Sequence, residues 1–157
     1  MAAGLSGQCL CGKISYKIER PKSKLGACHC TMCRRWSGGV FIGLQVAPDD
    51  IEFEGAEHLA SFAFSDWAER VFCTTCGANM YYRVTAPGPY HGVYHVGSGT
   101  LDEHGDLKLV EELFIDIKPQ GYSFAEKTHA MTTAEVAALF ADADGADADS
   151  DGDGDGD

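Results

Sequence analysis

Seven cysteines fall into three short clusters, and their spacing is typical of metal-binding turns. Two thiolates that lie one or two residues apart can bind the same ion through a tight turn. Gly12 and Gly77 each follow the last cysteine of a cluster, and glycine lets the backbone turn its amide groups toward the sulfurs. The sequence therefore predicts thiolate ligands in three groups: Cys9 and Cys11; Cys28, Cys30 and Cys33; Cys73 and Cys76.

The expected cellular location also favours metal ligation over disulfides. No apolar run approaches the ~20 residues that cross a bilayer, and Met1 to Gly7 lacks the pattern of a signal peptide. We therefore expect a cytoplasmic protein that contacts no membrane. Thiols are kept reduced in the cytoplasm, and an odd number of cysteines would leave one unpaired.

Ligand counting favours two zinc ions per chain, bound in different ways. A structural zinc site has four protein ligands, and the first and last clusters together supply four thiolates. The middle cluster, Cys28, Cys30 and Cys33, would leave one coordination position free, as catalytic zinc sites do. Two alternatives stay open: His29 could close the second site, or Cys33 could be spare while Cys28 and Cys30 join the first cluster.

A zinc ion held by three thiolates carries a net charge of −1 and polarises a carbonyl weakly. It suits sulfur chemistry better, because a substrate thiol that enters the free position would lose its proton. We therefore expect a reaction that makes or breaks a carbon–sulfur bond. Arg34 and Arg35 follow the last ligand and could bind a substrate carboxylate bidentately, although two solvated arginines on a turn are an equal alternative.

Three histidines have possible roles at such a site. His29 lies between two cysteines, where it could shuttle protons or bind metal, but a packed side chain is the favoured interpretation. His91 and His95 are four residues apart in a predicted strand and would share one face. They could line a pocket, and a partly exposed strand surface is the simpler explanation.

The elements that must hold these residues are mostly strands. Apolar and β-branched residues alternate in six segments, which the pattern predicts as strands: 13–19, 39–46, 59–64, 78–84, 92–96 and 111–117. A capping-box pair, Thr132 and Glu135, predicts one short helix. We therefore expect one domain over 1–131, a short C-terminal helix over 132–141 and a disordered acidic tail over 142–157.

Charge argues against nucleic acid as a partner. The net charge is −12, and eight aspartates of the expected tail supply most of it. The remainder has a net charge of −4 and contains no basic stripe.

The motifs resemble the glutathione-dependent formaldehyde-activating enzyme family, also called the centromere protein V family. The resemblance runs from about Gly7 to Tyr122. It rests on five segments: Gly7 to Gly12, Cys28 to Arg35 with Gly38, Phe72 to Gly77, Gly99 to Asp102, and Phe114 to Pro119.

This resemblance implies a β-tent fold of two twisted antiparallel sheets around a structural zinc, as in methionine-R-sulfoxide reductases. It assigns the first and last cysteine clusters to the structural zinc, and Cys28, Cys30 and Cys33 to a catalytic zinc. The implied activity is that of a carbon–sulfur lyase or synthase acting on a thiol adduct, such as glutathione with formaldehyde. The competing hypotheses are a non-catalytic zinc module that binds a protein partner, and a reductase on the same fold.

Overall fold

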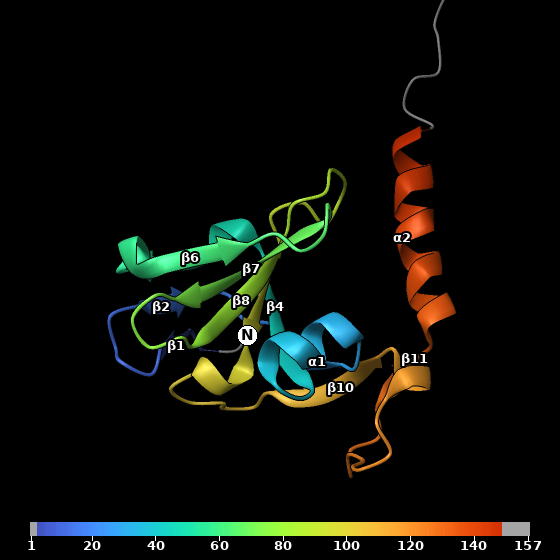
Figure 1. The fold of residues 1–157 in the computed structure, drawn as a ribbon, viewed down its shortest axis with the longest axis horizontal. Helices are drawn as coiled ribbons and strands as arrows, with labels where there is room; N and C mark the ends of the chain where they lie inside the picture. The colour runs from blue at the N-terminus through green and yellow to red at the C-terminus, as the bar shows by residue number, and fades with distance from the viewer. Residues whose placement is uncertain (1–2, 149–157) are drawn as a thin grey trace, which may run out of the picture.

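The computed structural model describes residues 3–148 and forms two β-sheets and two α-helices (Figure 1). The smaller sheet has the order β1-β2-β5, with bounds Leu5–Gln8, Ser15–Ile18 and Ile51–Glu54. The larger sheet has the order β11-β10-β3-β4-β9-β8-β7-β6. Its bounds in that order are His129–Met131, Lys108–Leu113, Lys24–Cys28, Phe41–Val46, Tyr94–Gly97, Asn79–Val84, Ala68–Cys73 and Leu59–Phe62.

The mainly β fold with two sheets and a C-terminal helix is confirmed. All pairings between neighbouring strands are antiparallel except those of β10, which pairs in parallel with both β3 and β11. The larger sheet is therefore mixed. Each of the six predicted strand segments overlaps one observed strand, with β9 and β10 extending beyond their predicted bounds, whereas β1, β3, β5, β7 and β11 were not predicted.

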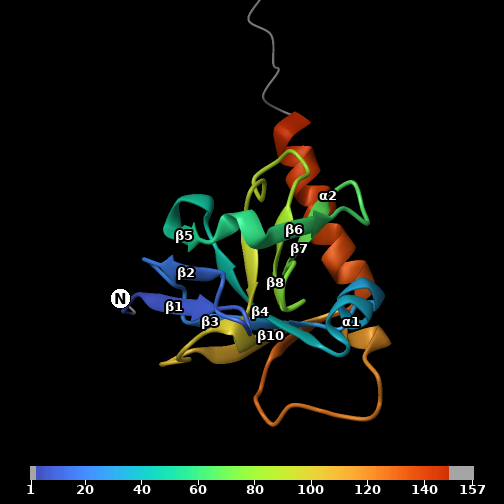
Figure 2. The same cartoon turned by 60° about the vertical axis from the view of Figure 1, so that its left-hand side comes forward.

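Side chains of the larger sheet enter two separate hydrophobic clusters. Tyr81 packs in the larger cluster with residues of β2 such as Tyr16, so this cluster joins the two sheets. Its neighbour Tyr82 packs in the second cluster, which contains the middle cysteines and Phe41. Adjacent residues of a strand point to opposite faces. The larger sheet thus has a core face against the smaller sheet and a second face that carries the middle cysteines. Figure 2 shows β1 and β2 on one side of the molecule and α1 on the other.

The short helix α1, Thr31–Ser37, begins directly after the cysteine strand β3 and was not predicted. The Sγ atom of Cys30 accepts a hydrogen bond from the amide of Cys33 and so caps its first turn. Gly38, with a φ of 78°, ends the helix in the left-handed conformation that glycine adopts readily.

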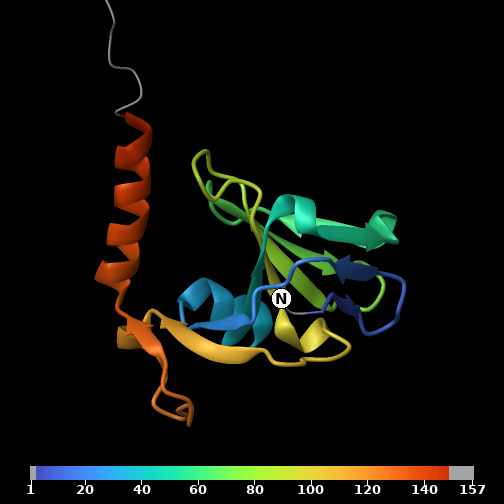
Figure 3. The same cartoon turned by 180° about the vertical axis from the view of Figure 1, so that it is seen from behind.

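The C-terminal helix is longer than expected. Helix α2 covers Thr133–Ala148, so the prediction of a helix over 132–141 and a disordered tail from residue 142 is wrong for residues 142–148. Three of the seven residues from 142 to 148 are alanine, which has the highest helix propensity and favours continuation of the helix. The expected disorder of residues 149–157 lies outside the described residues. Helix α2 stands at the opposite end of the molecule from β1 and β2 (Figure 3).

Among residues 3–148, no helix has both the length and the apolar character that crossing a membrane requires.

The close contact between Gly55 and the loop before β2 gives a test of this architecture. Gly55 has a φ of 77°, and a Cβ atom there would lie 1.8 Å from the carbonyl oxygen of Lys13. We expect Gly55→Ala to lower the free energy of unfolding by about 3 kcal/mol or more, because backbone atoms must move. Gly105→Ala is the control, since its φ is 50° but nothing lies within 4 Å of the added atom. Gly105→Ala should lower the free energy of unfolding by only the ~1–2 kcal/mol that the left-handed conformation costs a residue other than glycine. Equal losses in chemical denaturation would contradict the packing of this loop.

Candidate metal centres

The seven cysteines form two separate groups in space. The sulfurs of the first group all lie within 4.8 Å of one another, and so do those of the second. The groups are Cys9, Cys11, Cys73 and Cys76, and Cys28, Cys30 and Cys33. All seven thiols are free. The structure thus brings together the two ligand sets that counting favoured, and it leaves out the alternative that joined the first and middle clusters.

The four-cysteine group has the geometry of a closed tetrahedral site. The Sγ atoms of Cys9 and Cys11 are 3.5 Å apart, and those of Cys11 and Cys73 are 3.8 Å apart. Two sulfurs on a tetrahedral ion with metal–sulfur bonds of about 2.3 Å lie about 3.8 Å apart. The amide of Ile14 also donates to the sulfur of Cys9 at 3.3 Å, which stabilises a thiolate. This group could hold a metal ion that ties the loop before β2 to the turn between β7 and β8.

The three-cysteine group lies where β3 runs into α1. Cys28 ends β3, Cys30 caps α1, and Cys33 lies in the first turn of that helix. All three side chains are buried. Among the described residues, no His, Cys, Asp or Glu atom joins them as a fourth ligand within 4.8 Å. The group could hold a metal ion with one position open.

His29 does not close this site. Its ring is fully buried, and both nitrogens have other partners. Nε2 lies 2.9 Å from a carboxylate oxygen of Glu112, and Nδ1 lies 2.8 Å from the hydroxyl of Tyr122. The favoured interpretation of a packed histidine therefore fits the structure, and the alternative of a fourth ligand does not.

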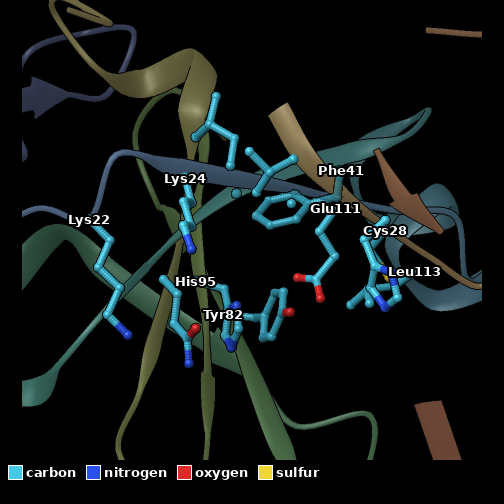
Figure 4. Close-up of a pocket in the computed structure, with 14 residues that line it drawn as sticks. Lys22, Lys24, Cys28, Phe41, Tyr82, His95, Glu111 and Leu113 are labelled. Carbon is cyan, nitrogen blue, oxygen red and sulfur yellow. The ribbon is translucent and has the colours of Figure 1, made fainter. Parts of the chain in front are cut away.

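A cleft of about 480 Å³, called here the polar cleft, runs from Cys28 across the larger sheet to two lysines. Figure 4 shows Lys22 and Lys24 at one end and Cys28 at the other. Tyr82, His95 and Glu111 lie between the two ends, and the Glu111 carboxylate points into the cleft (Figure 4).

Burial fixes the charge of two side chains in this cleft. The rings of Tyr82 and His95 stack with their centroids 4.2 Å apart and an interplanar angle of 12°. Desolvation lowers the pKa of His95 to about 4, so its imidazole is neutral at pH 7. Desolvation also raises the pKa of Tyr82 well above its ordinary value, so the phenol keeps its proton. Glu111 therefore supplies a carboxylate between two neutral rings and the cysteines.

A second cavity of about 210 Å³, called here the apolar cavity, reaches all three cysteines from the side of α2. It shares Cys28, Tyr82, His95 and Glu111 with the polar cleft, so the two spaces meet at Cys28. The linings of the two spaces do not include Arg34 or Arg35. Substrate binding by these arginines stays a prediction. His91 lies in the turn before β9, away from both spaces, whereas His95 lies in β9 and lines both.

Arg70 on β7 is a buried charge beside the three cysteines. Its side chain is 3% exposed, and its Nη2 atom donates to the Sγ of Cys33 at 3.8 Å. The guanidinium lies over the rings of Trp36 and Tyr82, 5.8 and 5.7 Å from their centroids. No carboxylate lies within 4.0 Å of it in the described part of the chain.

A buried arginine is always charged and is costly unless a negative group neutralises it. A divalent ion with three thiolates has a net charge of −1, which balances Arg70. In the metal-free cluster, thiol hydrogen bonds from Cys28 and Cys33 lower the pKa of Cys30 well below its ordinary value, and Arg70 adds to this shift. Arg70 thus favours a negative sulfur centre with or without metal.

Several of these groups were not predicted from the sequence: Lys22, Lys24, Arg70, Tyr82 and Glu111. Arg70 lies in a strand whose other residues, apart from Glu69, are apolar. A charged residue in the middle of such a strand was the available signal. Lys24 lies on the same strand as Cys28 and Lys22 precedes that strand, so both reach the cleft along the chain. Tyr82 and Glu111 become neighbours of Cys28 through strand pairing.

Three comparisons with known proteins agree with this geometry. Residues 4–116 match the model of the family described as "Glutathione-dependent formaldehyde-activating enzyme". The chain is 32% identical over 131 residues to a Schizosaccharomyces pombe protein named "Uncharacterized lyase C29B12.13", a match that covers 83% of this chain and 92% of the relative. The crystal structure of a Rhodobacter sphaeroides protein is similar, with a TM-score of 0.55 and 26% identity over 68% of this chain and 98% of that one.

These matches show that the chain shares its mainly β fold with known relatives, and they support an enzymatic role. The chain belongs to the glutathione-dependent formaldehyde-activating enzyme family.

The two cysteine groups should differ in their effect on stability. Cys73→Ala removes a ligand that joins segments 62 residues apart, whereas Cys30→Ala disturbs a group confined to six residues of chain. A structural metal can contribute on the order of 10 kcal/mol to folding. We expect Cys73→Ala to leave little folded protein and Cys30→Ala to lower the melting temperature by a few degrees. Equal melting temperatures would contradict the division into structural and open sites.

Arg70 should set the metal affinity of the three-cysteine group. We expect Arg70→Met to weaken binding of Co²⁺ or Zn²⁺ there by about 10- to 100-fold, which corresponds to about 1.4–2.8 kcal/mol. Arg70→Lys keeps a positive charge and should lose less metal affinity than Arg70→Met. Competition with a chelator, followed by the thiolate absorption of bound cobalt, measures both variants. The four-cysteine group is the internal control, because its affinity should not change. Unchanged affinity in Arg70→Met would contradict the charge balance.

Proposed function

We propose that the protein is a zinc-dependent carbon–sulfur lyase or synthase that breaks or forms the adduct of a thiol and an aldehyde. The observation that carries this proposal is the three-cysteine group, whose members lie together in the wall of the apolar cavity, with Cys28 also lining the polar cleft. Sulfur ligands and small four-coordinate sites suit zinc. With Cys28, Cys30 and Cys33 as its ligands, a zinc ion would bind a substrate thiol and stabilise it as a thiolate.

Glu111 is the group proposed to move the proton. In the lyase direction its carboxylate would take the hydroxyl proton of the adduct. The oxygen electron pair then forms the carbonyl as the carbon–sulfur bond breaks, and the electron pair of that bond leaves with the sulfur as a thiolate. In the synthase direction Glu111 returns the proton to the new hydroxyl oxygen. Its position supports this role, because it lines both cavities together with Cys28 (Figure 4).

The polar cleft is proposed to hold the thiol half of the adduct. Lys22 and Lys24 lie at the end away from Cys28, where they can bind carboxylates (Figure 4). A volume of about 480 Å³ is enough for a small peptide. Glutathione, a tripeptide with two carboxylates, is therefore the first thiol to test.

A comparison of glutathione with S-methylglutathione tests the thiol step. Both carry the same peptide and carboxylates, but only glutathione can form a thiolate. Calorimetry on the zinc-loaded protein should show that the S-methyl form binds at least about tenfold more weakly, which is about 1.4 kcal/mol. Binding of glutathione should also release a proton and strengthen as pH rises, since the free thiol must be deprotonated.

Cys33→Ser supplies the control, because serine is a poor zinc ligand and should remove the difference between the two peptides. Equal affinity of the zinc-loaded wild type for both would contradict the thiolate mechanism. If neither peptide binds, glutathione is not the thiol half.

A further inference from the structure

Helix α2 lies outside the region that matches the family model, yet it supplies part of the wall next to the cysteines. The family match ends at residue 116, and α2 begins at Thr133. Val136, Leu139 and Phe140 of this helix line the apolar cavity together with all three cysteines. Figures 1 and 3 show α2 at the edge of the molecule beside β11. The helix is thus an addition to the family region that reaches the site.

The apolar cavity continues into a further space of about 420 Å³, called here the outer cavity. The two share seven apolar or aromatic wall residues: Met32, Trp67, Val84, Tyr90, Phe114, Val136 and Phe140. In the described part of the chain, the outer cavity has no charged residue in its lining. The remainder of its wall comes from the loop of residues 86–89 and from two further positions on α2. The space beside the cysteines therefore leads away from them along an apolar path.

Aromatic rings from the two sides of this space lie close to one another. The ring of Phe140 lies 6.2 Å from Trp67 and 6.1 Å from Tyr90, measured between centroids. Phe114 is the only described non-glycine residue with a positive φ, 60°, and its side chain lines both apolar spaces. Such a conformation is unfavourable for a residue with a large side chain and is retained where the surroundings require it. The structure thus accepts backbone strain at this wall.

A formaldehyde adduct does not use this space, because its aldehyde half has one carbon and no substituent. We propose that the apolar and outer cavities bind the apolar substituent of a larger aldehyde, so that the substrates are adducts of aliphatic or aromatic aldehydes with several carbons. The proposal rests on the function above. It places the thiol half toward Lys24 and the aldehyde substituent toward Phe140, with the carbon–sulfur bond at the cysteines.

The direct test is the rate of cleavage for adducts of one thiol with formaldehyde, butanal and hexanal. Each buried methylene contributes about 0.8 kcal/mol, so kcat/KM should rise about three- to fourfold per carbon until the cavity is filled. Phe140→Ala should lower kcat/KM for the hexanal adduct about tenfold and leave the formaldehyde adduct unchanged. Phe62→Ala is the matched control, because Phe62 is also an exposed phenylalanine but lines neither space. It should change neither rate.

A binding measurement separates this inference from the proposed reaction. Trp36 and Trp67 are the two tryptophans, so Trp36→Phe leaves Trp67 as the sole tryptophan reporter inside the apolar space. Hexan-1-ol should change its fluorescence at concentrations where methanol does not, and adding Phe140→Ala should weaken that response at least severalfold. This readout needs no metal at the three-cysteine group and no thiol.

The outcomes are distinct. Equal kcat/KM for the formaldehyde and hexanal adducts in an active protein would overturn the inference and leave the proposed function standing. A Trp67 response that is the same for hexan-1-ol and methanol would also overturn it. Binding of hexan-1-ol without cleavage of any adduct would overturn the proposed reaction, and the assignment of substrate with it.

Discussion

Side chains alternate between the two faces of a β-sheet, and in this protein the alternation separates the packing of the core from the chemistry of the site. On β8, Tyr81 joins the core between the two sheets while Tyr82 lies beside the middle cysteines. A shift of one residue in the register of this strand would exchange the two rings. Tyr82 therefore reaches the cysteines only in the observed register of β8 with β7 and β9.

The same constraint explains how a charge can be buried at the centre of the larger sheet. Arg70 points to the face of the three cysteines, where a sulfur atom and two aromatic rings surround it. A neutral cysteine cluster would leave this guanidinium uncompensated at a cost of several kcal/mol. Arg70 and the cysteines are thus electrostatically dependent on each other, although the sequence separates Arg70 from Cys33 by 37 residues.

The sequence predicted what depends on local pattern and missed what depends on pairing. Ligand counting favoured a division into groups of four and three but left two alternatives open, and only the positions of the sulfurs and of the His29 ring in space exclude them. Alternation was enough for strands such as β4 and β8. It was not enough for β3, whose Gly26 and small Ala27 weaken the apolar signal. Glu111 gave no signal, because parallel pairing of β10 with β3 is what brings it beside Cys28.

That parallel pairing has a consequence for the order in which the protein assembles. Cys28 pairs with Phe41 of β4 and with Leu113 of β10, so the strand that bears the first thiol of the middle cluster acquires its second neighbour only after most of the chain has been made. The four-cysteine group needs nothing beyond Cys76. Contacts between residues far apart in sequence form slowly, because loop closure costs entropy before the contact contributes. The four-cysteine group can therefore form before β10 docks, whereas the wall around the middle cysteines is completed only when β10 pairs with β3, and these thiols are less protected from oxidants and other metals until then.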